Sequence, residues 1–265
     1  MIETGSTAVV TGASSGIGEQ FARQLAARGV NLVLTARNEV RLQSLTDQLK
    51  AAHPDVGVAV MTADLSVPTA AAELTEKLTV AGVTVDMLVN NAGFGSHDLF
   101  VDEDPDNVAR EIQLNCGSLV ALTARLLPGM LARGRGGVLN VASTAAFQPV
   151  PTIAVYAASK AFVLSFTEAL WEETRGSGVR VLALCPGATE TGFFEVTGKE
   201  FMTHGRQTPE FVAAVGLRAF DSGHGPSVVS GLANRMLANG YRFLPRGAMV
   251  RLARMNVRAA RTPPA

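Results

Sequence analysis

Residues 11–18 read Thr-Gly-Ala-Ser-Ser-Gly-Ile-Gly and stand between a short apolar run and a helical pattern over Gly16–Arg28. Gly12 permits a tight turn, and Gly16 lets the backbone approach a bound group closely. Gly18 lets the new helix pack closely against the strand. The free N–H groups and the dipole at the start of that helix attract anions. A strand, a glycine loop and a helix in this order therefore predict a site for the pyrophosphate of a nucleotide.

Short apolar runs alternate with longer helical patterns over most of the chain. Strands are expected at Thr7–Thr11, Asn31–Thr35, Val56–Thr62, Asp86–Asn90, Gly137–Ala142 and Val179–Leu184, with a seventh at Tyr241–Leu244. Helices are expected at Gly16–Arg28, Glu39–Ala52, Thr69–Ala81, Asp106–Arg133, Tyr156–Arg175 and Ser227–Ala238. Most strands are apolar without alternation, as in parallel sheets covered on both faces. The pattern predicts an α/β fold, a doubly wound Rossmann-type parallel sheet of about seven strands with helices on both faces.

The chain has 265 residues, of which 47% are hydrophobic, and it shows no repeat, low-complexity segment or linker. Residues 1–265 are therefore expected to form a single dinucleotide-binding and catalytic domain around one large core. Residues 192–226 interrupt the strand–helix alternation after the carboxyl end of a strand. Ligands bind at that edge of open α/β sheets, so this segment is expected to form a substrate lid.

The formal net charge is zero, but the end of the chain is basic. Residues 222–265 contain seven arginines and no acid, so residues 1–221 carry a charge of −7. A basic helix is expected over residues 247–262, with Arg251, Arg254, Arg258 and Arg261 on one face. Its apolar face is expected to dock on protein. Contact with a membrane surface is the less favoured alternative, and no nucleic-acid partner is expected.

Composition also bears on metals and on the compartment. Cys116 and Cys185 lie far apart and fit no redox or metal spacing, so both are expected to be reduced core residues. The four histidines likewise show no spacing typical of metal ligands, and no metal is expected. The sequence has no recognisable signal peptide and no run of about 18 apolar residues, which predicts a cytoplasmic protein.

Tyr156-Ala-Ala-Ser-Lys160 carries the chemistry, because residues four apart on a helix share one face. The phenol and the ammonium can then converge on one site. A tyrosine normally titrates near pH 10, and a fixed cation beside it is expected to lower that pKa towards a useful value. Ser143 follows a predicted strand, where its hydroxyl can hydrogen-bond a substrate carbonyl oxygen.

Together, the Gly-x-x-x-Gly-x-Gly loop, the Tyr-x-x-x-Lys pair and Asn90-Asn91-Ala92-Gly93 resemble the short-chain dehydrogenase/reductase family over about residues 5 to 195. The resemblance implies catalysis by Ser143, Tyr156 and Lys160, with Asn115 holding a water in a proton relay. It also implies a dinucleotide bound by a larger set: Gly12, Ser14, Ser15, Gly16, Ile17, Gly18, Asp64, Leu65, Asn91, Ala92, Gly93, Tyr156, Lys160, Pro186, Gly187, Thr189 and Thr191. Of the two threonines, Thr191 is favoured as the nicotinamide contact by its offset from Pro186.

The end of the second strand indicates which dinucleotide binds. An acid there would bind the ribose hydroxyls of NAD, but the strand ends in Thr35-Ala36-Arg37-Asn38. The guanidinium of Arg37 suits the 2′-phosphate of NADP. The expected cofactor is therefore NADP(H).

The expected function is the transfer of a hydride between NADP(H) and a carbonyl/secondary alcohol pair, working in reduction. An apolar ketone or acyl-type carbonyl is expected, because the pocket is predicted to be lined by Phe94, Phe147, Val150, Phe193, Phe194, Phe201, Met202 and Phe211. An NAD-dependent alcohol or steroid dehydrogenase and a non-catalytic NADPH-binding regulatory module are the alternatives. The family resemblance also implies a homodimer or homotetramer formed through the helices at Asp106–Arg133 and Tyr156–Arg175, where Phe162, Phe166 and Leu170 form an apolar stripe.

Overall fold

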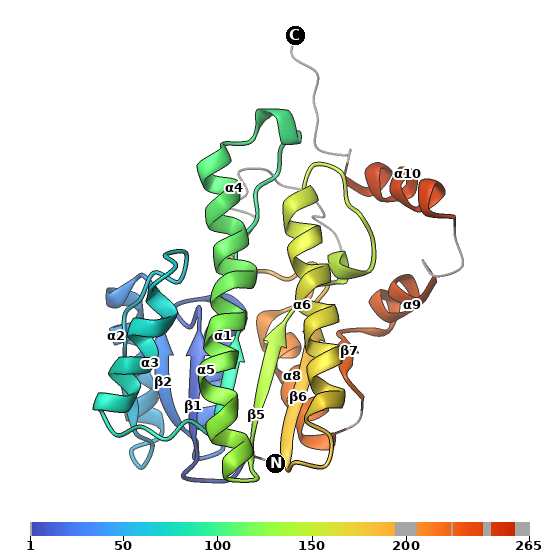
Figure 1. Cartoon of the computed structure of the whole chain (residues 1–265). Helices are drawn as coiled ribbons and strands as arrows, with labels where there is room; N and C mark the ends of the chain where they lie inside the picture. The colour runs from blue at the N-terminus through green and yellow to red at the C-terminus, as the bar shows by residue number, and fades with distance from the viewer. Residues whose placement is uncertain (1, 194–205, 224, 241–244, 258–265) are drawn as a thin grey trace.

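A computed structural model describes residues 2–193, 206–223, 225–240 and 245–257, with side chains described up to residue 254 (Figure 1). Seven parallel strands form one sheet in the order β3-β2-β1-β4-β5-β6-β7. They are β1 (Thr7–Thr11), β2 (Asn31–Thr35), β3 (Val58–Val60), β4 (Met87–Asn90), β5 (Gly136–Val141), β6 (Val179–Cys185) and β7 (Ser227–Val229). The order reverses between β1 and β4, which creates the crevice where ligands bind in such sheets. The predicted doubly wound α/β fold is confirmed.

Helices cover both faces of the sheet (Figure 1). They are α1 (Gly16–Ala26), α2 (Glu39–Ala52), α3 (Ala70–Val80), α4 (Pro105–Ile112), α5 (Leu119–Ala132), α6 (Ala154–Glu173), α8 (Pro209–Ser222), α9 (Leu232–Gly240) and α10 (Arg246–Val257). Neighbouring residues of a strand point to opposite faces. Val10 accordingly packs in one core cluster with Phe21 of α1 and Phe220 of α8. Val9 packs in a second cluster with Leu74 of α3 and Leu122 of α5.

The long helix predicted at Asp106–Arg133 is three elements in the structure. A π-helical turn, η2 (Gln113–Ser118), separates α4 from α5. The combined stretch Pro105–Ala132 is long and apolar enough to cross a membrane by length and composition alone, and no other helix in the described ranges is. Core helices pass the same test, and Leu122, Leu127 and Met130 of α5 are buried against the sheet.

The first part of the helix predicted at Ser227–Ala238 was wrong, because it forms the seventh strand of the sheet. Ser227–Val229 pairs in parallel with β6, although the sequence pattern assigned these residues to a helix. A three-residue strand is too short to show a period of its own, and α9 begins only at Leu232, after Gly231 with φ +85°. The predicted strand Tyr241–Leu244 lies outside the described residues.

Two segments after β6 were expected to form a substrate lid (192–226) and a basic helix (247–262). Pro209–Ser222 of the expected lid forms α8, whose Val212, Leu217 and Phe220 are buried in the core. The remainder of that segment is mostly outside the described residues. Within α10, Ala253 is 1% exposed and Met249 is 7% exposed, so one face of this helix packs on the protein.

Candidate active site

Two glycines of the 11–18 loop have a left-handed backbone, and neighbouring atoms leave no room for a side chain on either. Gly12 has φ +65° and Gly16 has φ +58°. A Cβ on Gly12 would lie 2.8 Å from Asn91 Nδ2, and one on Gly16 would lie 2.8 Å from Thr191 Cγ2. The loop therefore fits closely against the segments that follow β4 and β6.

The start of α1 is open to a ligand. Ser15 occupies the N-cap, and its side chain makes no capping hydrogen bond with the first turn. The N–H groups of that turn can therefore bind an anion. Gly18 lies behind this point, packed against the Gly12 carbonyl and Asn91, and does not line the cavity. It contributes close packing of helix on strand.

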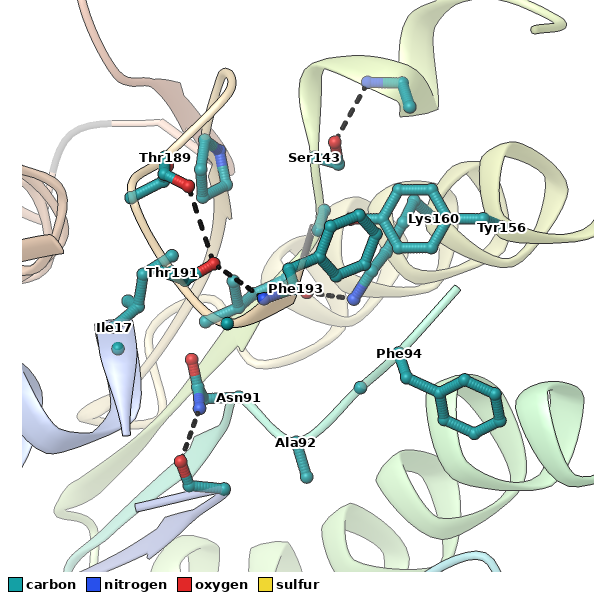
Figure 2. A pocket seen from close by; sticks show the side chains of 18 of the residues that line it. Ile17, Asn91, Ala92, Phe94, Ser143, Tyr156, Lys160, Thr189, Thr191 and Phe193 are labelled. Carbon is teal, nitrogen blue, oxygen red and sulfur yellow. Dashed lines mark hydrogen bonds between the residues drawn. The ribbon is translucent and has the colours of Figure 1, made fainter. Parts of the chain in front are cut away.

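One cavity of about 570 Å³ joins the predicted residues from both halves of the sheet (Figure 2). It is lined by these predicted positions: Gly12, Ser14, Ser15, Gly16, Ile17, Arg37, Asp64, Leu65, Asn91, Ala92, Gly93, Ser143, Tyr156, Lys160, Pro186, Gly187, Thr189 and Thr191. Figure 2 shows Ile17 and Thr191 on one side of the pocket, with Tyr156 and Lys160 on the other. Apart from Gly18, only Asn115 among the predicted site residues lies outside this lining.

The end of the cavity beside β2 is basic. Arg37 and Asn38 line it together with Arg41, which the sequence analysis missed. Asn38 Oδ1 accepts a hydrogen bond of 2.9 Å from the Arg41 N–H, which caps α2 and fixes the turn between the two arginines. Arg41 lies in the first turn of α2 and Arg37 precedes that helix, so the signal that could have identified Arg41 was its nearness in sequence to the end of the second strand.

Asp64 lines the same end and also forms a turn. Its Oδ1 accepts hydrogen bonds from the Ser66 N–H at 3.0 Å and from Ser66 Oγ at 2.7 Å. Burial favours a higher pKa for this carboxyl, but the Ser66 bonds and the charges of Arg37 and Arg110 leave the pKa below its usual value. Asp64 is therefore a carboxylate held in a fixed orientation at the cavity wall.

Ser143 and Tyr156 meet at the carboxyl edge of β5. Ser143 begins the 3-10 turn η3 (Thr144–Phe147), and its Oγ accepts a hydrogen bond of 3.1 Å from the Ala145 N–H. Burial raises the pKa of Tyr156 to about 12, and the charge of Glu111 also raises it. A hydrogen bond from Ser143 acts in the opposite direction and lowers this pKa. Burial therefore favours the protonated phenol.

Lys160 lies one turn further along α6 and is 5% exposed. Its Nζ donates a hydrogen bond of 2.9 Å to the Val141 carbonyl and lies 5.7 Å from the centre of the Tyr156 ring. Burial lowers the pKa of Lys160 to about 8. The expected lowering of the Tyr156 pKa by Lys160 is not found in this structure, in which burial of the phenol raises that pKa.

Asn115 sits in the π-helical turn and is 1% exposed. Its Nδ2 donates to the Phe94 carbonyl at 2.8 Å and to Ser159 Oγ at 3.0 Å, and its Oδ1 accepts from the Phe94 N–H at 3.1 Å. Both amide hydrogens are thus used, so a relay water could bond only to Oδ1. The observed contacts make Asn115 a support for the loop that follows β4.

The threonines after β6 have different surroundings. Thr189 Oγ1 donates to the Gly187 carbonyl at 2.9 Å, and the residue is 5% exposed. Thr191 Oγ1 accepts from the Phe193 N–H at 3.3 Å, and its methyl group faces Gly16. Both line the cavity, and Thr191 bridges the glycine loop and the Phe193 wall.

Much of the remaining cavity wall is apolar. Phe94, Val150 and Phe193 line it as predicted, and the Phe193 and Tyr156 ring centres lie 5.0 Å apart. Two predicted wall residues were wrong: Phe147 packs in a core cluster, and Phe211 is 43% exposed on α8. Phe194, Phe201 and Met202 lie outside the described residues. The sequence analysis missed Gln148, Ile153, Leu237 and Ala253, which tertiary folding brings to the wall.

A model of the short-chain dehydrogenases matches residues 6–200, and the chain belongs to that family. Its members are oxidoreductases that act on the alcohol/carbonyl pair. The human very-long-chain 3-oxoacyl-CoA reductase is 35% identical over 188 residues, which cover 69% of this chain and 59% of the human enzyme. The corresponding reductase of Mycosarcoma maydis is 38% identical over 182 residues, or 68% of this chain and 52% of that enzyme. The chain thus spans little more than half the length of these relatives.

Solved structures match over nearly the whole chain. A short-chain dehydrogenase from Sphingobium yanoikuyae in complex with NADPH is 31% identical, with a TM-score of 0.81, over 97% of this chain and 98% of that one. A bulky-bulky ketone specific alcohol dehydrogenase from Comamonas testosteroni is 29% identical, with a TM-score of 0.78, over 97% of both chains.

Proposed function

We propose that this protein is an NADP(H)-dependent carbonyl reductase. The observation that carries the proposal is that Ser143, Tyr156 and Lys160 line the same cavity as the glycine loop. A proton donor, an oxygen-orienting hydroxyl and a dinucleotide cradle in one cavity are the parts that carbonyl reduction requires.

The chain's own residues fit NADP(H). Gly12 and Gly16 let the loop pass close to Asn91 and Thr191, where a Cβ would clash, and the start of α1 offers N–H groups to a pyrophosphate. Arg37 and Arg41 supply positive charge at the end of β2, as a 2′-phosphate requires. The similar Sphingobium yanoikuyae structure holds NADPH. When bound, this cofactor supplies the hydride for the carbonyl carbon.

The residues of α6 and η3 handle the proton. Ser143 orients the carbonyl oxygen, and Tyr156 donates its proton to that oxygen as negative charge develops there. Lys160, fixed by the Val141 carbonyl, contributes positive charge at neutral pH because its pKa of about 8 keeps it mostly protonated. Burial of the Tyr156 phenol favours its protonated form, which is the form that donates a proton in reduction.

An apolar ketone or an acyl-type carbonyl is the proposed substrate. Phe94, Val150, Ile153 and Phe193 form an apolar wall beside Tyr156. Apolar pockets with a few convergent polar groups bind substrates of this kind. Relatives that reduce very-long-chain 3-oxoacyl-CoA and an alcohol dehydrogenase specific for bulky ketones support the same class.

The test is the oxidation of NADPH and NADH, followed by absorbance, with a panel of apolar ketones and 3-oxoacyl thioesters. Turnover with NADPH supports the proposal, and the ratio to NADH reports the contribution of Arg37 and Arg41. Tight NADPH binding with no turnover on any carbonyl would instead support the non-catalytic module. Faster alcohol oxidation with NAD would support the dehydrogenase alternative.

A further inference from the structure

Glu111 is a buried carboxyl outside the cavity, and the proposed reaction does not use it. It lies on α4 and is 0% exposed. One of its oxygens, Oε2, accepts hydrogen bonds of 3.2 Å from both the N–H and the Oγ of Ser96. The other oxygen, Oε1, is buried and has no hydrogen-bond partner among the described residues. A carboxyl buried in this way costs stability, so its position calls for a functional reason.

The carboxyl holds one end of a short loop that supports the tyrosine. Asn115, four residues after Glu111, binds both the N–H and the carbonyl of Phe94. Glu111 binds Ser96 at the other end of the loop. Between these anchors, a Cβ on Gly95 would lie 2.8 Å from Tyr156 Cδ2, so the bare backbone of the loop packs against the tyrosine ring.

The loop also forms the wall of the cavity. Phe94 lines the cavity, and Gly95 lies close to Phe193 as well as to Tyr156. On its far side, His97 Nε2 lies 3.2 Å from Thr152 Oγ1, which ties the loop to the segment before α6. A change at Ser96 therefore reaches both the proton donor and the substrate wall.

The elements packed around Glu111 each place a charged or titratable group near it. Glu103 approaches from the end of the 3-10 turn η1 (Phe100–Asp102), Cys116 from η2, and Tyr156 and Lys160 from α6. Burial raises the pKa of Glu111 to about 7. The Ser96 hydrogen bonds and the charge of Lys160 lower this pKa, and the charge of Glu103 raises it. In return, its charge raises the pKa of Tyr156, Lys160 and Cys116.

We propose that Glu111 is a positioning residue for Tyr156, and that its carboxylate form holds the loop of residues 93–96 in the arrangement that supports turnover. The inference rests on the proposed carbonyl reduction. Hydrogen bonds to a carboxylate are about twice as strong as those to a neutral group. Protonation of Glu111 therefore loosens Ser96, and with it the backbone that packs on the Tyr156 ring.

The first experiment is a pH profile of kcat/KM between pH 5.5 and 8.5. The wild type should lose activity below a midpoint near pH 7, where Glu111 gains a proton. Glu111→Gln keeps the shape without titrating, so the inflection should disappear and activity at pH 8 should fall about tenfold. Glu173→Gln removes an exposed carboxylate from α6 and should keep the wild-type profile. His97→Gln should also keep the inflection.

A second variant covers the case in which Glu111→Gln does not fold. Ser96→Ala removes one donor from the carboxylate and leaves the backbone N–H in place. Loss of a bond that favours the charged form raises the pKa of Glu111, so the inflection should move to higher pH. An inflection that survives in Glu111→Gln, or that does not move in Ser96→Ala, would overturn the proposal.

A readout without turnover separates this proposal from the proposed function. The Ser96 amide and the Tyr156 ring resonances should shift together near pH 7 in NMR spectra of the wild type, and neither should shift in Glu111→Gln. If no carbonyl is turned over but these signals titrate, the positioning role stands and the reductase proposal fails. If turnover is present and Ser96 does not titrate, the positioning role fails alone.

Discussion

Asn91 donates two hydrogen bonds to Thr11 where the neighbouring strands β4 and β1 end. Thr11 Oγ1 accepts from the Asn91 N–H at 2.9 Å, and Asn91 Nδ2 donates to the Thr11 carbonyl at 2.9 Å. The same Thr11 oxygen accepts from the Ala92 N–H at 3.0 Å. The end of β4 and the start of the glycine loop are therefore one rigid unit, with Gly12 enclosed between them.

Gly12→Ala should abolish nucleotide binding and destabilise the protein. The new methyl group would clash with Asn91 Nδ2 and the Ala92 backbone. The alanine backbone would also be held in a left-handed conformation. Gly82→Ala is the matched control, because Gly82 has φ +66° and nothing within 4 Å. It should cost about 1 kcal/mol of unfolding free energy and leave binding intact. NADPH titration and urea denaturation of both variants measure the difference; equal losses of affinity would contradict the close fit.

Tyr156→Phe should lower kcat at least a hundredfold, because it removes the proton donor while the ring still packs against Gly95 and Phe193. NADPH affinity should change little. Single-turnover and fluorescence-binding measurements on the same preparation separate the two effects. Near-normal turnover would show that another group delivers the proton.

Arg37→Ala and Arg41→Ala should each weaken NADPH binding far more than NADH binding, since only NADPH carries the 2′-phosphate. Each loss is expected to be about tenfold or greater, the scale of a charge-assisted hydrogen bond. Lys50→Ala, at the exposed far end of α2, is the control and should affect neither nucleotide. Equal losses for both nucleotides would mean that the arginines do not meet the 2′-phosphate.

Lys160→Met should be more stable than the wild type at pH 7. The folded-state pKa of Lys160 is lowered from 10.5 to about 8, so the folded protein binds this proton less tightly than the unfolded chain. The stability of the wild type relative to the variant should therefore rise with pH between about 8 and 10.5. Urea denaturation across this range measures it, and a gap that is constant with pH would contradict the lowered pKa.

Phe162→Lys should disrupt an oligomer formed through α6. The Phe162 ring is 47% exposed and stacks on Phe166 with their centres 6.1 Å apart, which leaves an apolar surface on this helix. Leu170, predicted as part of the same stripe, is buried in the core and is not available. Light scattering at micromolar concentration should give an oligomer for the wild type and a smaller species for the variant. A monomeric wild type would refute the interface.

The sequence predicted most of the sheet because its strands are buried on both faces and therefore consist of continuous apolar runs. The glycine spacing placed the 11–18 loop, and the i, i+4 spacing placed Tyr156 and Lys160 in one cavity. Those features are local in sequence. Local patterns did not reveal the edge strand β7, which is defined by its pairing with β6.

The rest of the site depends on contacts between distant segments. The raised pKa of Tyr156 comes from burial, which a sequence does not state. The contact of Gly95 with Tyr156 and the bond from Ser96 to Glu111 join residues 61 and 15 positions apart. Cys116, predicted as a core residue, is only half-buried, and its Sγ lies 3.7 Å from the Ser159 carbonyl oxygen of α6.

The π-helical turn Gln113–Ser118 also determines which direction the side chains of α4 face relative to those of α5. Such a turn holds one residue more than an α-helical turn, so α4 and α5 are out of step by one position. Deletion of a single residue there would let the segment close into continuous α-helix. Glu111 would then rotate by about 100° about the helix axis and advance by about 1.5 Å, which would separate it from Ser96. The extra residue thus fixes the orientation of Glu111. A chain shortened by one residue here would keep the fold and lose the contact of Glu111 with the loop that packs on Tyr156.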